Sequence, residues 1–332
     1  MMTMTNIFKS IQSFRKYVWG VLFYNILVIL WGAFVRATGS GAGCGAHWPL
    51  CNGEVIPRAP AVETLIEFTH RLSSGLVVIL MAVLVIAAFR LFPKGHLVRK
   101  SAAAAGVFTI VESLIGAVLV LNELTGQNDS IHRAVVMMIH LINTFLLVAA
   151  IFLTARWSAD DHSNRLELKR GGWSVLIYLG LTGMIVLGAS GAVTALGDTL
   201  YPATSLVQGL QQDFDPTANF LIRLRVFHPG IAALMGVYTL AAALAFRRNF
   251  PFQLMQQATY ALSALFVLQL VLGVINVILL APVWMQILHL LVTNLIWLAW
   301  LWLAELFFSG RFALQSRRDH AIHQSVSQSL TQ

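Results

Sequence analysis

Eight long apolar runs divide the chain, and they constrain its fold more than any other feature. A membrane-spanning helix needs about 20 consecutive apolar residues. Runs of that length lie near residues 17–36, 65–89, 101–121, 134–155, 173–196, 224–246, 259–281 and 283–308. Only 11% of the 332 residues are charged, whereas soluble domains have about 25%. The sequence therefore predicts an all-α integral membrane protein with eight transmembrane helices.

The basic residues predict how the helices are oriented. The net charge is +8, which in a soluble protein would suggest a nucleic-acid partner. Most of the basic residues instead fall in alternate connections and terminal segments, at Lys9, Arg15, Lys16, Arg90, Lys94, Arg99, Lys100, Arg156, Arg165, Lys169, Arg170, Arg247, Arg248, Arg311, Arg317 and Arg318. The positive-inside rule places these segments in the cytoplasm. We therefore expect a multi-pass protein of the bacterial inner membrane with cytoplasmic termini and no nucleic-acid partner. No small-residue cleavage site follows the first run, so we expect that run to remain as a membrane helix.

The second half of the chain repeats the first. The segment around His70 recurs around His228, 158 residues later, and Gly32-Ala33 aligns with Gly188-Ala189. A repeat of four spans gives each copy the same orientation in the membrane. The sequence therefore predicts two tandem four-helix bundles related by a pseudo-twofold axis along the membrane normal.

This repeat predicts the domain organisation. We expect a cytoplasmic N-terminal segment at 1–16, a first bundle at 17–155, a cytoplasmic linker at 156–172, a second bundle at 173–308 and a cytoplasmic tail at 309–332. A site built by one bundle should have a counterpart at the same depth in the other.

Four histidines lie inside the expected spans and form two matched pairs. His70 and His140 belong to the first bundle, and His228 and His289 belong to the second. Each should lie roughly 7–11 Å below the outer boundary, given the rise per residue of a helix. Two histidines at equal depth on alternate helices of a bundle can ligate one heme iron from opposite sides. The alternatives are hydrogen bonds between helices, or a metal-ion or proton-transport site. Zinc is disfavoured because two histidines per half leave a tetrahedral set incomplete unless cysteine or carboxylate ligands are added.

The two halves differ next to the first histidine of each pair. Glu67 stands three residues before His70, and Arg225 stands three residues before His228. A carboxylate in that place can accept a proton, or it can form an ion pair with Arg71. A guanidinium there can bind a heme propionate through charge-assisted hydrogen bonds. The first half is therefore expected to be reactive and the second to hold a fixed cofactor.

Further charged residues belong to the same comparison. Arg71 in the first half and Arg223 in the second are additional candidates for binding propionates. Glu112 stands where the second half has Gln269. Glu112 could be a second proton-handling group or a hydrogen-bonded contact between helices, and the sequence favours neither.

The loop after the first span contains the only two cysteines, Cys44 and Cys51. It faces the oxidising side of the membrane, where disulfides persist. A separation of seven residues can close such a loop, which favours a disulfide over two free thiols. His47 and Trp48 between them could cover a pocket mouth, or Trp48 could pack inside the protein.

Together these motifs resemble the heme A synthase family of bacteria and mitochondria. The resemblance is carried by the loop GSGAGCGAHWPLCNG, the Glu67-Phe-Thr-His70-Arg71 motif and the paired histidines, and it covers about residues 17–308. It implies oxidation of the C8 methyl group of heme O to a formyl group, which gives heme A for terminal oxidases. Glu112 departs from the neutral residue expected at its position.

The resemblance also implies a role for each site residue. His70 and His140 would hold the heme O substrate, with Glu67 as the catalytic carboxylate. His228 and His289 would ligate a heme B cofactor, and Cys44 and Cys51 would form the disulfide of the outer loop.

Other partners and functions stay open on the sequence alone. Heme O synthase, cytochrome oxidase assembly factors and a second copy of the chain are candidate partners, beside the lipid bilayer. Two other functions use the same histidines: a diheme electron-transfer protein of cytochrome b type, and a transporter of heme or another small molecule.

Overall fold

The described part of the protein is helical throughout. The computed structural model describes residues 10–159 and 171–309. Within these ranges eight helical segments are long and apolar enough to cross a membrane. They are α1 (Ile11–Ala37), α2 (Val62–Leu91), α3 (Leu97–Leu121), α4 (Ile131–Trp157), α5 (Gly172–Leu200), the pair α7 (Phe220–Arg225) and α8 (Phe227–Asn249), α9 (Gln253–Ile278) and α10 (Val283–Phe308). The predicted eight-helix membrane protein is thereby confirmed.

Two short helices accompany the spans, η2 (Ser40–Ala42) and α6 (Leu206–Phe214). Three of the expected segments, 1–16, 156–172 and 309–332, lie wholly or largely outside the described residues. The same holds for several of the basic residues that predict orientation, namely Lys9, Arg165, Lys169, Arg170, Arg311, Arg317 and Arg318.

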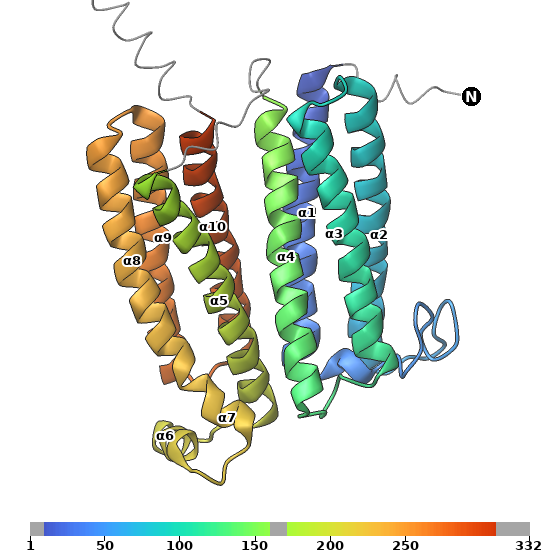
Figure 1. Ribbon diagram of the computed structural model, residues 1–332. Coiled ribbons are helices and arrows are strands. Elements are labelled where there is room, and N and C mark those ends of the chain that lie inside the picture. The colour runs from blue at the N-terminus through green and yellow to red at the C-terminus, as the bar shows by residue number, and fades with distance from the viewer. Residues whose placement is uncertain (1–9, 160–170, 310–332) are drawn as a thin grey trace, which may run out of the picture.

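The spans form two groups that stand side by side (Figure 1). Helices α1 to α4 make one group, and α5 and α8 to α10 make the other. The connections α2–α3 and α8–α9 lie at one end of the molecule, whereas α6 and the loop after α1 lie at the opposite end. This alternation agrees with helices that each cross the same layer once.

Large aromatic side chains join the two groups. The ring of Phe145 on α4 stacks on Trp297 of α10 with centroids 5.1 Å apart, and Trp297 Nε1 donates to the Phe145 carbonyl over 2.8 Å. Near the α2–α3 end, Arg156 of α4 forms a 2.8 Å ion pair with Glu305 of α10. Packing and paired polar groups therefore both hold the two groups together.

The sixth span is broken, which the sequence analysis did not predict. Helix α7 ends at Arg225 and α8 begins at Phe227, with Val226 between them. The cause is Pro229, because a proline has no N–H to donate to the carbonyl four residues earlier and its ring clashes with that carbonyl. Arg225 occupies that earlier position. The interruption falls two residues before His228.

Candidate heme sites

The second-half histidines face each other. His228 on α8 and His289 on α10 have ring centroids 6.5 Å apart, with the ring planes inclined by 70°. Two imidazoles that ligate one iron from opposite sides at about 2 Å have centroids about 6 Å apart. The separation of the two rings therefore fits a single heme iron between them.

The first-half histidines occupy the corresponding helices. His70 lies on α2 and His140 on α4, within one group of four helices. The Nδ1 atoms of His70, His140 and His289 are buried and have no hydrogen-bond partner among the described residues. Buried polar atoms are nearly always paired in proteins. Unpaired ring nitrogens in both halves suit side chains that ligate or bind a group at these positions.

Two glycines leave room for the rings of His70 and His228. A Cβ atom added at Gly32 of α1 would lie 2.9 Å from His70 Cε1, and one at Gly191 of α5 would lie 3.0 Å from His228 Cε1. The functional counterpart of Gly32 is therefore Gly191, and the expected alignment with Gly188 was wrong at this point. Gly188 instead packs against the ring of Phe145.

A serine orients one histidine of the second half. Ser190 Oγ lies 2.9 Å from His228 Nδ1 and itself donates to the Leu187 carbonyl over 2.8 Å. The hydroxyl is thereby left to accept the Nδ1–H of His228, and Nε2 of His228 is the nitrogen free to ligate. Ser190 directly precedes Gly191. In the first half Trp31 directly precedes Gly32, so a tryptophan stands where the second half has this serine. No separate sequence signal marks this contact, because one serine in an apolar run is ordinary.

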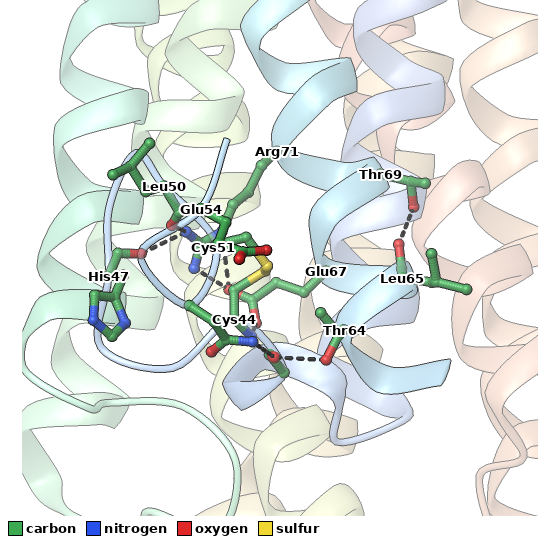
Figure 2. Close-up of a disulfide and its surroundings, with 12 residues drawn as sticks. Cys44, His47, Leu50, Cys51, Glu54, Thr64, Leu65, Glu67, Thr69 and Arg71 are labelled. Atoms are coloured by element: carbon green, nitrogen blue, oxygen red, sulfur yellow. Dashed lines mark hydrogen bonds and ion pairs between the residues drawn. A yellow bond between two sulfur atoms is a disulfide. The ribbon is translucent and has the colours of Figure 1, made fainter. Parts of the chain in front are cut away.

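The outer loop of the first half is closed by a disulfide, as predicted (Figure 2). Cys44 and Cys51 are bonded and have Cα atoms 4.4 Å apart. The loop is pinned to α2 through Thr64, whose hydroxyl donates to the Gly43 carbonyl over 2.7 Å. Trp48 is 39% exposed, so the alternative that it packs inside the protein is wrong.

Glu67 is buried beneath this loop and has partners at both carboxylate oxygens. Cys44 N–H donates to Glu67 Oε2 over 2.8 Å. Arg71 forms an ion pair with Glu67 Oε1 and also donates to the carbonyls of His47 and Leu50. The ion pair with Arg71, considered as an alternative from the sequence, is present. The guanidinium N–H groups of Arg71 thus donate to Glu67 and to the loop carbonyls in this structure.

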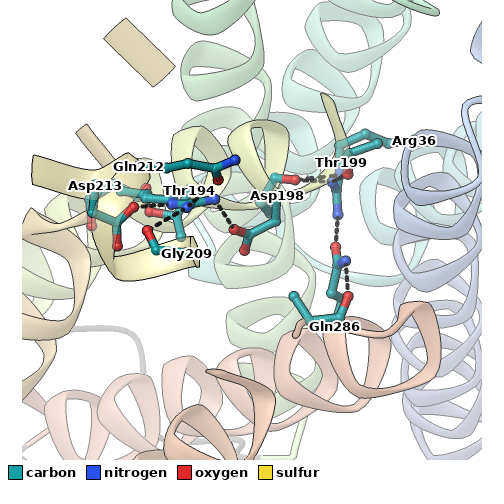
Figure 3. Close-up of polar contacts among 12 residues, drawn as sticks. Arg36, Thr194, Asp198, Thr199, Gly209, Gln212, Asp213 and Gln286 are labelled. Carbon is teal, nitrogen blue, oxygen red and sulfur yellow. Dashed lines mark hydrogen bonds and ion pairs between the residues drawn. The ribbon is translucent and has the colours of Figure 1, made fainter. Parts of the chain in front are cut away.

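Arg225 has a different environment from Glu67. Its guanidinium forms ion pairs with Asp198 at 3.3 Å and with Asp213 of α6, and donates to the Gly209 carbonyl over 3.3 Å. Arg225 therefore fastens α6 to the end of α5, whereas Arg223 on the same short helix is exposed. Figure 3 shows the partners Asp198, Gly209 and Asp213 gathered at this end.

A second arginine network joins the two groups of helices at the same end. Arg36 of α1 donates to the Ala195 carbonyl and Thr199 Oγ1 of α5, each over 2.6 Å. Its other nitrogen donates to Gln286 Oε1 of α10 over 2.9 Å (Figure 3). Arg36 thus joins α1 of the first group to α5 and α10 of the second. The sequence analysis did not single it out, since Arg36 lies at the end of an apolar run and matches no motif.

The sequence also matches a known protein family and several known proteins. The family model COX15-CtaA, described as cytochrome oxidase assembly protein, matches residues 15–301. A protein of Thermus thermophilus named protoheme IX farnesyltransferase is 52% identical over 288 residues, which are 87% of this chain and 47% of that protein. The chain thus spans about half the length of that relative.

Relatives of lower identity are named heme A synthase. The protein from Alkalihalophilus pseudofirmus is 38% identical over 149 residues, which are 44% of this chain and 48% of the relative. The protein from Exiguobacterium sibiricum is 31% identical over 222 residues, which are 66% of this chain and 70% of the relative.

Proposed function

The chain belongs to the COX15-CtaA family of cytochrome oxidase assembly proteins, among which it resembles the heme A synthases, and from this we propose that it oxidises the C8 methyl group of heme O to the formyl group of heme A. The observation that carries the proposal is the presence of two intramembrane histidine pairs with unlike surroundings. Among the residues that the structure describes, only the pair that contains His70 has a buried carboxylate, Glu67, one helical turn away.

The reaction requires both a proton acceptor and an electron carrier. Converting a methyl group to a formyl group, counted with water as the oxygen source, releases four protons and four electrons. The protons need an acceptor beside the substrate, and the electrons need a carrier that the reaction does not consume. A chain with a carboxylate near one histidine pair and a second, differently built pair suits this division.

The second half is the proposed cofactor site. His228 and His289 would ligate a heme B, and their 6.5 Å ring separation supports this. Heme B, when bound there, supplies one-electron transfer. Ser190 fixes the His228 ring, which favours permanent binding because an oriented ligand loses less entropy when it ligates.

The first half is the proposed substrate site. His70 and His140 would hold heme O, and the His70 ring lacks a side-chain partner of the kind that Ser190 provides. Glu67 would accept protons at the C8 methyl group, and Arg71, held between Glu67 and the loop carbonyls, would orient that carboxylate.

The remaining assignments follow from this arrangement. Bundles 17–155 and 173–308 would be the substrate and cofactor domains, with both termini in the cytoplasm of a bacterium. Heme O would arrive from a heme O synthase, and heme A would pass to cytochrome oxidase assembly. Arg223 and Arg225 stay candidates for propionate contacts, although Arg225 already bonds Asp198 and Asp213.

The proposal is tested by expressing the chain in a bacterial host that makes heme O but no heme A. Hemes extracted from the membranes are separated and identified by mass. A formyl heme that appears only with this chain supports the proposal. A purified protein that carries two equivalents of heme B and yields no formyl heme would instead identify a diheme electron-transfer protein.

A further inference from the structure

Glu112 and Gln269 occupy matching places beside the two histidines that α4 and α10 carry. Glu112 Oε1 on α3 lies 3.6 Å from His140 Nδ1, and Thr144 donates to the same oxygen. The Thr144 hydroxyl also lies 2.9 Å from the His140 carbonyl, four residues earlier. Glu112, Thr144 and His140 therefore form one polar cluster between α3 and α4.

The second half repeats this framework with an amide in place of the carboxylate. Gln269 Nε2 on α9 donates to Thr293 Oγ1 over 2.7 Å and to the His289 carbonyl over 3.1 Å. Thr293 in turn donates to the His289 carbonyl over 2.8 Å. The helices, the threonine and the histidine correspond in the two halves, and a carboxylate in the first half stands where the second half has an amide.

A carboxylate beside a ligating histidine has a known consequence. The nitrogen that does not bind the metal commonly donates its N–H to a carboxylate, which fixes the ring and makes the other nitrogen a stronger ligand. His140 Nδ1 is buried without a hydrogen-bond partner in the described structure, and Glu112 Oε1 is the carboxylate oxygen nearest to it. A separation of 3.6 Å is just longer than a hydrogen bond, and a small ring rotation closes it.

We propose that Glu112 is a positioning residue whose carboxylate accepts the Nδ1–H of His140 when His140 ligates the substrate heme. The stronger anionic character of that ligand favours ferric over ferrous iron in the first half, whereas Gln269 gives His289 no such charge. A heme bound in the first half would then have the lower reduction potential, which would favour electron transfer from it to a heme bound in the second half. This inference rests on the proposed function, because it takes His140 and His289 to be heme ligands.

A purely structural role for Glu112 makes a different prediction. Asn143 Nδ2 donates to Glu112 Oε2 over 2.5 Å, so the side chain also bonds α3 to α4. Gln269 shows that a glutamine in this place still bonds the neighbouring threonine. Glu112→Gln therefore keeps much of the helix contact and removes the charge, which separates the two roles.

The test is a spectroelectrochemical redox titration of the purified, heme-loaded protein. His140→Ala and His289→Ala assign each redox component to its half by the component that disappears. We expect Glu112→Gln to raise the midpoint potential of the first-half heme, with a tenfold loss of ferric preference corresponding to about 59 mV for one electron. Gln269→Glu should lower the potential of the second-half heme by a similar amount. Glu63→Gln removes an exposed carboxylate at the start of α2 and should change neither potential.

Each outcome decides the inference. Unchanged potentials in Glu112→Gln with full heme content overturn it and leave the proposed function standing. If Glu112→Gln is not stably produced, Gln269→Glu decides in the same way. A wild-type protein without any heme component that depends on His140 overturns this inference and the proposed substrate site together.

Discussion

The backbone N–H of Cys44 donates a 2.8 Å hydrogen bond to Glu67 Oε2, so the disulfide loop and the buried carboxylate of α2 form one unit. Arg71 completes it by bonding Glu67 and two loop carbonyls. The loop therefore covers the carboxylate and fixes its position next to His70. The carboxylate that we propose as the proton acceptor is thereby held in one place by the loop.

Replacing Glu67 with glutamine should abolish most formyl-heme production while the protein keeps its hemes. The amide oxygen can still accept from Cys44 N–H, but the side chain can no longer take a proton or pair with Arg71. A positioned general base contributes about 10²–10⁴-fold, so turnover should fall by at least about 100-fold. The measurement is heme A formed per heme-loaded protein, with Glu63→Gln as the control. Wild-type turnover in Glu67→Gln would remove the catalytic role.

Replacing Cys44 and Cys51 together with serine should lower stability and activity in parallel. Closing a loop of this length stabilises a protein by about 2 kcal/mol in the chain-entropy model. The freed loop would also let Cys44 N–H move away from Glu67. Thermal unfolding in detergent and formyl-heme production measure the two effects, with reduced wild-type protein as the matched comparison. Full activity in the double variant would show that the loop does not position Glu67.

Alanine substitutions at two glycines should disturb the two halves separately. A Cβ at Gly32 would lie 2.9 Å from His70 Cε1, and a Cβ at Gly191 would lie 3.0 Å from His228 Cε1. Overpacking of this kind costs about 1–3 kcal/mol, which the rings relieve by moving. Gly32→Ala should weaken retention of the substrate heme and Gly191→Ala that of heme B. Gly20→Ala on α1 is the control, because a Cβ there meets nothing within 4 Å.

Heme absorption spectra recorded during detergent dialysis measure this retention. Equal losses of both hemes in Gly32→Ala would contradict the assignment of one heme to each half.

Replacing Arg225 with alanine should destabilise the second half. The change removes the guanidinium that pairs directly with Asp198 and Asp213, and losing the direct partner of a partly buried carboxylate costs about 2 kcal/mol or more. Arg223→Ala on the same short helix removes an exposed guanidinium and should change the unfolding free energy by less than about 0.5 kcal/mol. Chemical denaturation in detergent compares the two, and equal effects would contradict the structural role of Arg225.

The spans, the histidines and the disulfide could be read from the sequence because each follows from a local rule. Twenty apolar residues in succession have few structures open to them in a membrane. Two cysteines in one short loop on the oxidising side have one obvious partner each. The repeat predicts that His70 and His228 lie at the same level.

The polar contacts between distant helices could not be read in this way. Arg36 contacts Gln286, which is 250 residues away in sequence, and no pattern along the chain relates them. Helix α6 is nine residues long and carries neither a long apolar run nor a motif. The break before His228 did have a signal in Pro229, and a stricter use of proline as a helix breaker would have found it.

The central claim is that the two histidine pairs hold different hemes, and half-specific variants test it most directly. Hemes are extracted from purified wild type, His70→Ala, His140→Ala, His228→Ala and His289→Ala after production in cells that make heme O, and are quantified by mass. We expect His70→Ala and His140→Ala to lose heme O and heme A but to keep heme B. We expect His228→Ala and His289→Ala to lose heme B before they lose heme O or heme A. Heme B in both halves of the wild type, or the same heme lost from all four variants, would contradict it.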